Sequence, residues 1–195
     1  MLEFFLIFFG LIIAVMVFAG IVGAEKEKGH RDEFKDSYAY ANDFDPQHIH
    51  VDSFGGSNVA VDMSAKKFAL GRKGMGSKIY AYDDLIAVDV RQNRRSIFKT
   101  NRGSQVAGAA VGAALFGPAG LLVGGLSGSQ RQEEKITELS LRLTVNNELN
   151  YSHEIIFFRN ASGVDATDPA ARRFLRDLDT WQGRFQYMMH NKAGS

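Results

Sequence analysis

Two blocks of the sequence carry almost no charge, and they constrain the fold more than any motif does. Residues 1–24 contain one charged residue, Glu3, and residues 103–129 contain none. The remaining sequence is strongly polar, so the net charge of +1 is an average over unlike segments. This balance argues against a dedicated nucleic-acid binder. The absence of cysteine excludes a disulfide scaffold, a thiolate zinc site and a cysteine nucleophile.

The amino-terminal block is long enough to cross a bilayer. Residues 2–22 are apolar apart from Glu3, and at 1.5 Å per residue they match a hydrocarbon core of about 30 Å. We expect an uncleaved transmembrane helix over residues 1–24. The alternative is a cleaved secretory signal, because Val22, Gly23 and Ala24 are small, but no Lys or Arg precedes the apolar run and that run is longer than usual for a signal.

The first basic residues follow this block, and they predict the topology. By the positive-inside rule, Lys26, Lys28, Arg31 and Lys35 place the amino terminus outside and the rest of the chain in the cytoplasm. The sequence therefore predicts a single-pass protein of a bacterial inner membrane. Residues 25–47 are charged and poorly periodic, which is typical of a juxtamembrane linker or a short helix closed by a turn at Pro46.

Short strands dominate after Pro46. Apolar alternation bounded by turn residues predicts strands over 49–53, 59–63, 67–70, 78–82, 85–90, 137–145 and 153–158. From Asp168 and Pro169 onward the apolar residues recur at helical spacing through about Asn191, which predicts one amphipathic helix. We expect a mainly β domain in two parts, residues 48–102 and 130–191, followed by a short tail at 192–195. The helix would plug one end of a bent sheet or partial barrel.

These residues resemble a known family. The run from Val61 to Leu70, the run from Ile79 to Val90, the two late strands and the helix containing Trp181 are similar to bacterial pleckstrin-homology (PH)-like domains, including the GRAM type. The resemblance covers about residues 49–189 and departs from the family at the long glycine-rich insertion. It implies a binding or interaction module rather than an enzyme.

The glycine-rich block, residues 103–129, has small residues at a spacing of four. They are Gly108, Gly112, Gly120, Gly124 and Gly128. This spacing lines one helix face and lets a second backbone approach closely, as in glycine-zipper segments. We expect a helical hairpin that turns at Gly117 and Pro118 and packs in a membrane or an assembly. Two alternatives remain open: a single kinked spanning helix, and a low-complexity loop or hairpin packed on its own domain.

Basic residues provide two candidate contacts for anionic lipid. Five lie just before the glycine-rich block: Arg91, Arg94, Arg95, Lys99 and Arg102. Cations beside a membrane-entering segment are attracted to anionic lipid. The resemblance to PH-like domains that bind acidic headgroups implies a second set, Lys66, Lys67, Arg72, Lys73 and Lys78.

No motif predicts catalysis, a cofactor or a metal. The glycines from Gly71 to Gly76 lack the Gly-Lys-Ser/Thr of a phosphate loop, and the pair His48 and His50 has no third ligand at a recognisable spacing. We expect a non-enzymatic, membrane-anchored interaction or assembly protein that self-associates, or docks on a larger membrane complex, through the glycine-rich hairpin. The alternative is a membrane-perturbing effector, such as a pore former or a phage exclusion factor.

Overall fold

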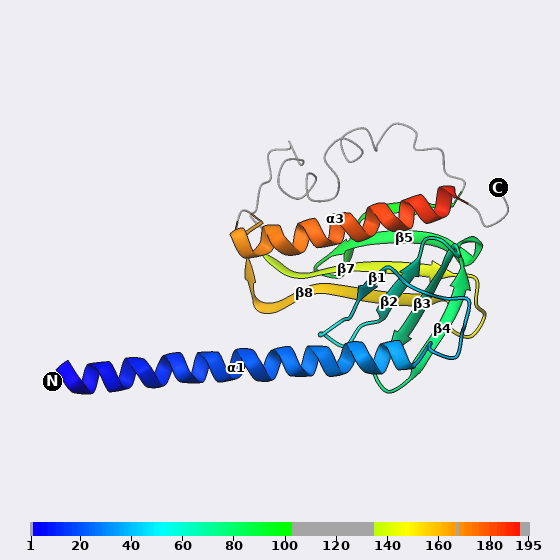
Figure 1. Cartoon of the computed structure of the whole chain (residues 1–195). Helices are drawn as coiled ribbons and strands as arrows, with labels where there is room; N and C mark the ends of the chain where they lie inside the picture. Colours follow the sequence, from blue (N-terminus) through cyan, green and yellow to red (C-terminus); the bar gives the residue numbers. More distant parts are fainter. Residues whose placement is uncertain (1, 103–134, 167, 192–195) are drawn as a thin grey trace, which may run out of the picture.

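Eight strands and two long helices make up the described structure (Figure 1). The computed structural model describes residues 2–102, 135–166 and 168–191. The elements are α1 (Leu2–Asp36), β1 (His48–His50), β2 (Asn58–Asp62), β3 (Lys67–Arg72), β4 (Gly76–Ala81), the 3₁₀ turn η1 (Tyr82–Asp84), β5 (Leu85–Gln92), β6 (Arg95–Asn101), β7 (Ile136–Val145), β8 (Ser152–Val164) and α3 (Pro169–His190).

The first sheet is a meander in the order β1-β2-β3-β4, with every pair antiparallel. The predicted hairpin of β2 and β3 is confirmed, with Val61 opposite Phe68. Its turn is shaped by Asp62, whose carboxylate accepts the backbone N–H groups of Ser64 and Ala65 at 2.9 and 2.8 Å. Burial raises the pKa of Asp62, but these donors, together with the backbone N–H of Asp45 and the side chain of Gln47, outweigh that effect and the net pKa is lowered.

The second sheet has the order β6-β5-β7-β8. Strands β5, β7 and β8 fall where the sequence predicts strands, although β8 continues to Val164. Strand β6 was not predicted. Its turn from β5 places Asn93 and Arg94 at φ values of 49° and 67°, the left-handed conformation that a two-residue hairpin needs but that is usually signalled by glycine.

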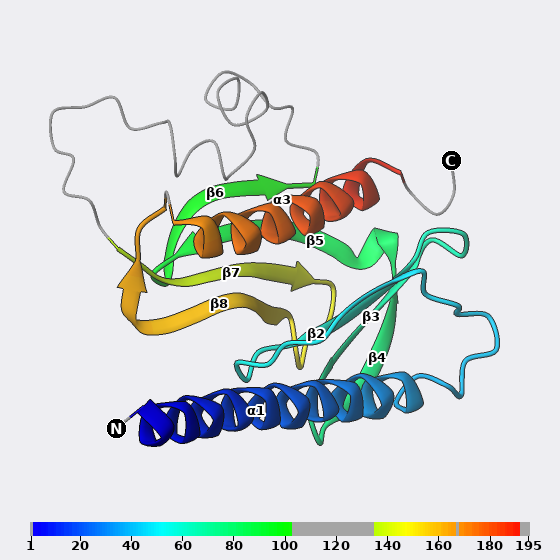
Figure 2. The same cartoon turned by 60° about the vertical axis from the view of Figure 1, so that its left-hand side comes forward.

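One core fills the space between the two sheets and α3. Val61 and Phe68 of the first sheet, Leu141 of the second, and Trp181 and Phe185 of α3 belong to this cluster. Figure 2 shows α3 lying across the second sheet. The predicted fold class, a mainly β domain closed by a carboxy-terminal helix, is therefore confirmed.

Helix α1 covers the outer face of the first sheet with its carboxyl-terminal part (Figure 2). Phe34 and Tyr38 pack there against Ala60 and Ala69 in a second apolar cluster. The helix is continuous to Asp36, so it includes the first half of the segment for which a linker or a short helix was expected. Among the residues that the structure describes, no helix meets the length and hydropathy that a membrane span requires. The anchor over residues 1–24 stays a prediction.

Candidate functional site

The glycine-rich block is inserted into the second sheet. The predicted packing glycines Gly108, Gly112, Gly120, Gly124 and Gly128, and the predicted turn at Gly117 and Pro118, lie outside the described residues. The strands on either side are described: β5 pairs with β6 before the block and with β7 after it. Because both flanks belong to one sheet, they lie on the same side of any membrane. The single kinked spanning helix, like the other interpretations of this block, concerns residues outside the described part of the chain.

Hydrogen bonds hold the chain at the point where the block begins. The guanidinium of Arg102 donates to the backbone carbonyls of Tyr82 and Asp83. The backbone N–H of Arg102 donates to the carbonyl of Ile86 at 2.8 Å. The end of β6 is thus fixed to the corner between the two sheets.

A second set of hydrogen bonds holds the chain where the block ends. The side chain of Asn93 donates to the carbonyl of Lys135 at 2.9 Å and accepts the backbone N–H of Thr137 at 2.8 Å. Asn93 sits in the β5–β6 turn, so this turn fixes the start of β7. Both ends of the block are therefore tied to the folded domain through β5 and its two turns.

The structure separates the five cations that precede the block. Arg91 donates to Glu154 at 2.9 Å and is largely buried, and Arg102 is used at the corner as described above. Arg94, Arg95 and Lys99 are exposed on the β5–β6 hairpin. The five residues thus form no single patch, and besides Arg91 and Arg102, Arg94 also has an internal partner, the Glu138 carboxylate at 3.7 Å.

The other set of cations is spread around the first sheet. Lys67 forms an ion pair with Asp43, and the ammonium of Lys78 lies 5.4 Å from the ring centroid of Tyr80. Arg72 and Lys73 lie beside α1 at the β3–β4 turn. Of this set, Arg72 and Lys73 line the cavity described next and Lys66, Lys67 and Lys78 do not, so the resemblance-based set does not converge on that cavity.

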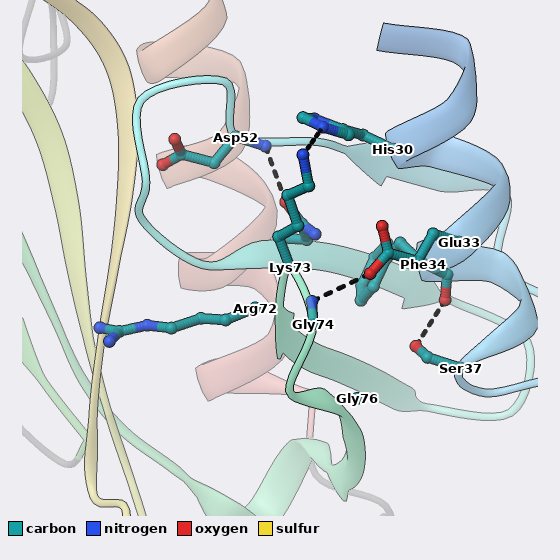
Figure 3. Close-up of a pocket in the computed structure, with 10 residues that line it drawn as sticks. His30, Glu33, Phe34, Ser37, Asp52, Arg72, Lys73, Gly74 and Gly76 are labelled. Atoms are coloured by element: carbon teal, nitrogen blue, oxygen red, sulfur yellow. Dashed lines mark hydrogen bonds between the residues drawn. The ribbon is translucent and has the colours of Figure 1, made fainter. Parts of the chain in front are cut away.

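That cavity lies between α1 and the first sheet and measures about 300 Å³ (Figure 3). Lys73 contacts His30 across it, and the N–H of Gly74 donates to Glu33 at 2.9 Å. Figure 3 shows the Asp52 carboxylate and the Arg72 guanidinium pointing away from its centre. The cavity is therefore lined by both polar and apolar groups, is close to charge-balanced, and is partly closed by the Lys73–His30 contact and the Gly74–Glu33 hydrogen bond.

The described residues contain no constellation for metal chemistry. No group of three His, Cys, Asp or Glu in this part of the chain could hold a metal ion. His50 packs instead on Phe157 and Trp181, with ring centroids 4.5 and 6.0 Å away. The metal reading of His48 and His50 has no support in this geometry.

One comparison with known proteins gives a match. A family model described as a glycine zipper containing PH domain matches residues 47–159, which is more than half of the chain. No curated protein and no solved structure matches. The match begins just before β1, includes the glycine-rich block and ends within β8.

Proposed function

Because the chain belongs to the family of glycine-zipper-containing PH domains, we propose that it is a non-enzymatic interaction module that self-associates at a membrane through residues 103–129. The PH-like fold supplies a rigid support. The glycine-rich block supplies the packing surface.

The observation that carries this proposal is the position of the block in the sheet. Strands β6 and β7 are both antiparallel to β5, so they run in the same direction with β5 between them. The last residue of β6, Asn101, lies opposite Ala87 near the start of β5. Strand β7 begins at Ile136, three residues before Leu139, which lies opposite Gln92 at the end of β5. The two ends are separated by roughly 27 Å at about 3.4 Å per strand residue, a span that about ten extended residues would cover.

Residues 103–134 provide about three times that length. Most of the block is therefore not needed to connect the strands. An uncharged segment of this length with glycine at intervals of four is suited to close packing against another helix. In water each glycine would cost a helix up to about 1 kcal/mol relative to alanine, which favours a packing role over a merely connecting one.

The membrane part of the proposal is supported by the exposed surface of α1. Phe8, Phe9, Leu11 and Val15 are each about 60% exposed. Large apolar side chains exposed together in this way mark a membrane or protein contact. The proposed location is the inner face of a bacterial membrane, with the PH-like domain in the cytoplasm.

Leucine at the packing positions tests self-association. The full chain carrying Gly112→Leu and Gly124→Leu should lose its oligomeric state in mild detergent, because the larger side chains prevent close backbone approach. Sedimentation or light scattering measures the size. The matched control is Gly112→Ala with Gly124→Ala, which keeps the positions small and should preserve the oligomer.

The single tryptophan provides the folding control. Trp181 belongs to the main core, so its fluorescence should be unchanged in both variants. An unchanged oligomer size in the leucine variant would overturn the proposal. Leakage of dye from sealed vesicles containing the wild-type chain would instead favour the membrane-perturbing alternative, since a scaffold leaves vesicles intact.

A further inference from the structure

A loop, and not a strand, covers one edge of β8. Strand β8 is the last strand of the second sheet, and in the described part of the chain only β7 pairs with it. Residues 51–57, which connect β1 to β2, reach the other edge. Figure 3 shows the Asp52 carboxylate on the side of this loop that is turned away from α1. We call residues 51–57 the strap.

Two hydrogen bonds attach the strap to the backbone of β8. The Asp52 carboxylate accepts the N–H of Ile156 at 2.6 Å, and the N–H of Ser57 donates to the carbonyl of Glu154 at 2.7 Å. A Cβ on Gly56 would lie 2.5 Å from the same carbonyl oxygen, so this close approach requires glycine. The strap thus replaces a neighbouring strand at two points only.

A buried histidine lies beneath the strap. His153 of β8 is 5% exposed, its Nδ1 lies 3.5 Å from the Ser57 hydroxyl oxygen, and its Nε2 lies 3.2 Å from the Asn150 carbonyl. The ring of Tyr80 is 6.2 Å away. Burial lowers the pKa of His153, the contact with Asn150 opposes this shift, and Arg72 adds to it. Opening of the strap would bring water to this imidazole.

A second buried histidine directly precedes the strap. The His50 ring lies 4.5 Å from that of Phe157, and it has a backbone contact at Ile156, the residue that the strap also binds. The Nε2 of His50 is buried and has no hydrogen-bond partner among the described residues. A proton on this atom would therefore be a buried donor without an acceptor.

The charged groups around His50 act in both directions. Burial is the largest effect and lowers its pKa, Asp52 of the strap and Asp177 of α3 raise it, and Arg31 of α1 lowers it. The net pKa is lowered, as it is for the histidine beneath the strap. The closed form therefore binds fewer protons at these positions than an open form in which both imidazoles are hydrated.

We propose that the strap opens in mild acid and exposes the edge of β8, while both sheets stay folded. Opening breaks two hydrogen bonds and local ring contacts, and no residue of the strap belongs to the main core. Proton concentration would thus control the exposure of unpaired backbone groups on an edge strand. This inference goes beyond the proposed function and depends neither on the membrane nor on self-association.

Amide hydrogen exchange of the full chain in detergent tests the proposal. The amides of Ser57 and Ile156 report on the strap, and the amide of Leu141, in β7 between two paired strands, reports on global unfolding. After division by the intrinsic rates, the strap amides should open more often than Leu141 and should respond little to low urea. Their opening constant should rise up to about tenfold for each histidine between about pH 7.5 and pH 5.5.

Removal of both imidazoles should abolish this rise. The variant is His50→Phe with His153→Phe, and the control is His190→Gln, at an exposed position of α3, which should keep the full pH response. Strap amides that exchange no faster than Leu141 would overturn the proposal, as would an unchanged pH response in the double variant.

A larger residue at the close approach should open the strap at every pH. Gly56→Ala places a Cβ against β8 and should expose the strap amides at neutral pH, while Leu141 keeps its protection. The matched control is Gly183→Ala, where a Cβ would meet nothing within 4 Å, and its strap should stay closed. Loss of protection at Leu141 in Gly56→Ala would show that the strap opens only when the domain unfolds, which would also overturn the proposal.

Discussion

At the scale of single residues, His50 is a largely buried titratable side chain that links stability to pH. It lies between Phe157 and Trp181, and its Nε2 has no hydrogen-bond partner among the residues described. Burial lowers the pKa of this imidazole. Asp52, Asp177 and a backbone contact at Ile156 oppose the shift, and Arg31 adds to it.

The lowered pKa predicts a loss of stability in acid. Below about pH 6.5 the unfolded chain binds more protons at this position than the folded chain, so the free energy of unfolding falls as the pH falls toward the native pKa. Burial lowers the pKa of His153 in the same sense. Urea unfolding of the full chain in detergent, followed by Trp181 fluorescence between neutral pH and about pH 5, should show this decline.

His50→Phe should remove part of the pH dependence, because the phenyl ring keeps the aromatic contacts and does not titrate. His190→Gln, at an exposed position of α3, should leave it unchanged. The same slope in all three proteins would contradict this account.

The grouping of the cations shows which site predictions the sequence alone could support. Cations close together in sequence, from Arg91 to Arg102, were grouped as one lipid contact. The structure places Arg102 at the corner of the sheets and brings Arg142, from a strand forty residues later, directly opposite Asp89 of β5. Strand register decides this grouping, and no local sequence signal shows which residues β5 pairs with across the glycine-rich block.

At the scale of elements, the docking of α1 on the first sheet depends on two positions. Phe34 is 3% exposed and contacts Tyr38 edge to face at 5.2 Å. A Cβ on Gly71 would lie 3.0 Å from the Phe34 ring and 2.6 Å from the carbonyl oxygen of Gly76, so only glycine allows this close approach. The segment over 25–47 showed no helical period because so few of its residues are buried, and sequence alone therefore left it as a linker or a short helix.

Phe34→Ala should release α1 from the first sheet. Truncation of a buried phenylalanine costs about 3–5 kcal/mol, and this loss falls on the local contact because Phe34 belongs to the outer cluster rather than the main core. Hydrogen exchange at the amide of Gly74, which donates to Glu33, should become faster. Tyr40→Ala, at a residue that is 69% exposed, is the control, and equal exchange rates in both variants would exclude this role for Phe34.

Strands were predicted correctly where the turns between them contain residues that are typical of turns. The β2–β3 hairpin was predicted because apolar runs flank a polar turn, whereas β6 was missed because Asn93 and Arg94 replace the expected glycine. The long apolar alternation of β7 and the helical period of α3 were sufficient to predict both elements. That these elements share one core could be expected from the fold class, and no single sequence motif predicts it.

At the scale of the whole molecule, the β1–β2 loop joins the two sheets. The carboxylate of Asp52 accepts the backbone N–H of Ile156 at 2.6 Å and that of Phe54 at 2.6 Å. Nearby, the N–H of Ser57 donates to the carbonyl of Glu154 at 2.7 Å. These bonds cover part of the free edge of β8 and connect that edge to the β1–β2 loop.

Asp52→Ala should therefore destabilise the whole domain. It leaves two amide donors without their carboxylate, at a cost of about 1–3 kcal/mol for each buried unsatisfied group. Urea unfolding monitored by Trp181 measures the change in the free energy of unfolding. Asp52→Asn keeps one of the two side-chain oxygens as an acceptor and should lose less; a loss as large as that of the alanine variant would contradict this account of the link.

Because both ends of residues 103–134 are fixed to the domain, the length and sequence of this connection can change without unfolding the domain. Asn93 and Arg102 hold the two ends independently of what lies between them. The entropic cost of closing a flexible connection rises only by about 0.6 kcal/mol for each doubling of its length. The same eight-stranded framework could therefore carry connecting segments of different length and composition, and so present different surfaces to different partners, without any change in how the sheets fold.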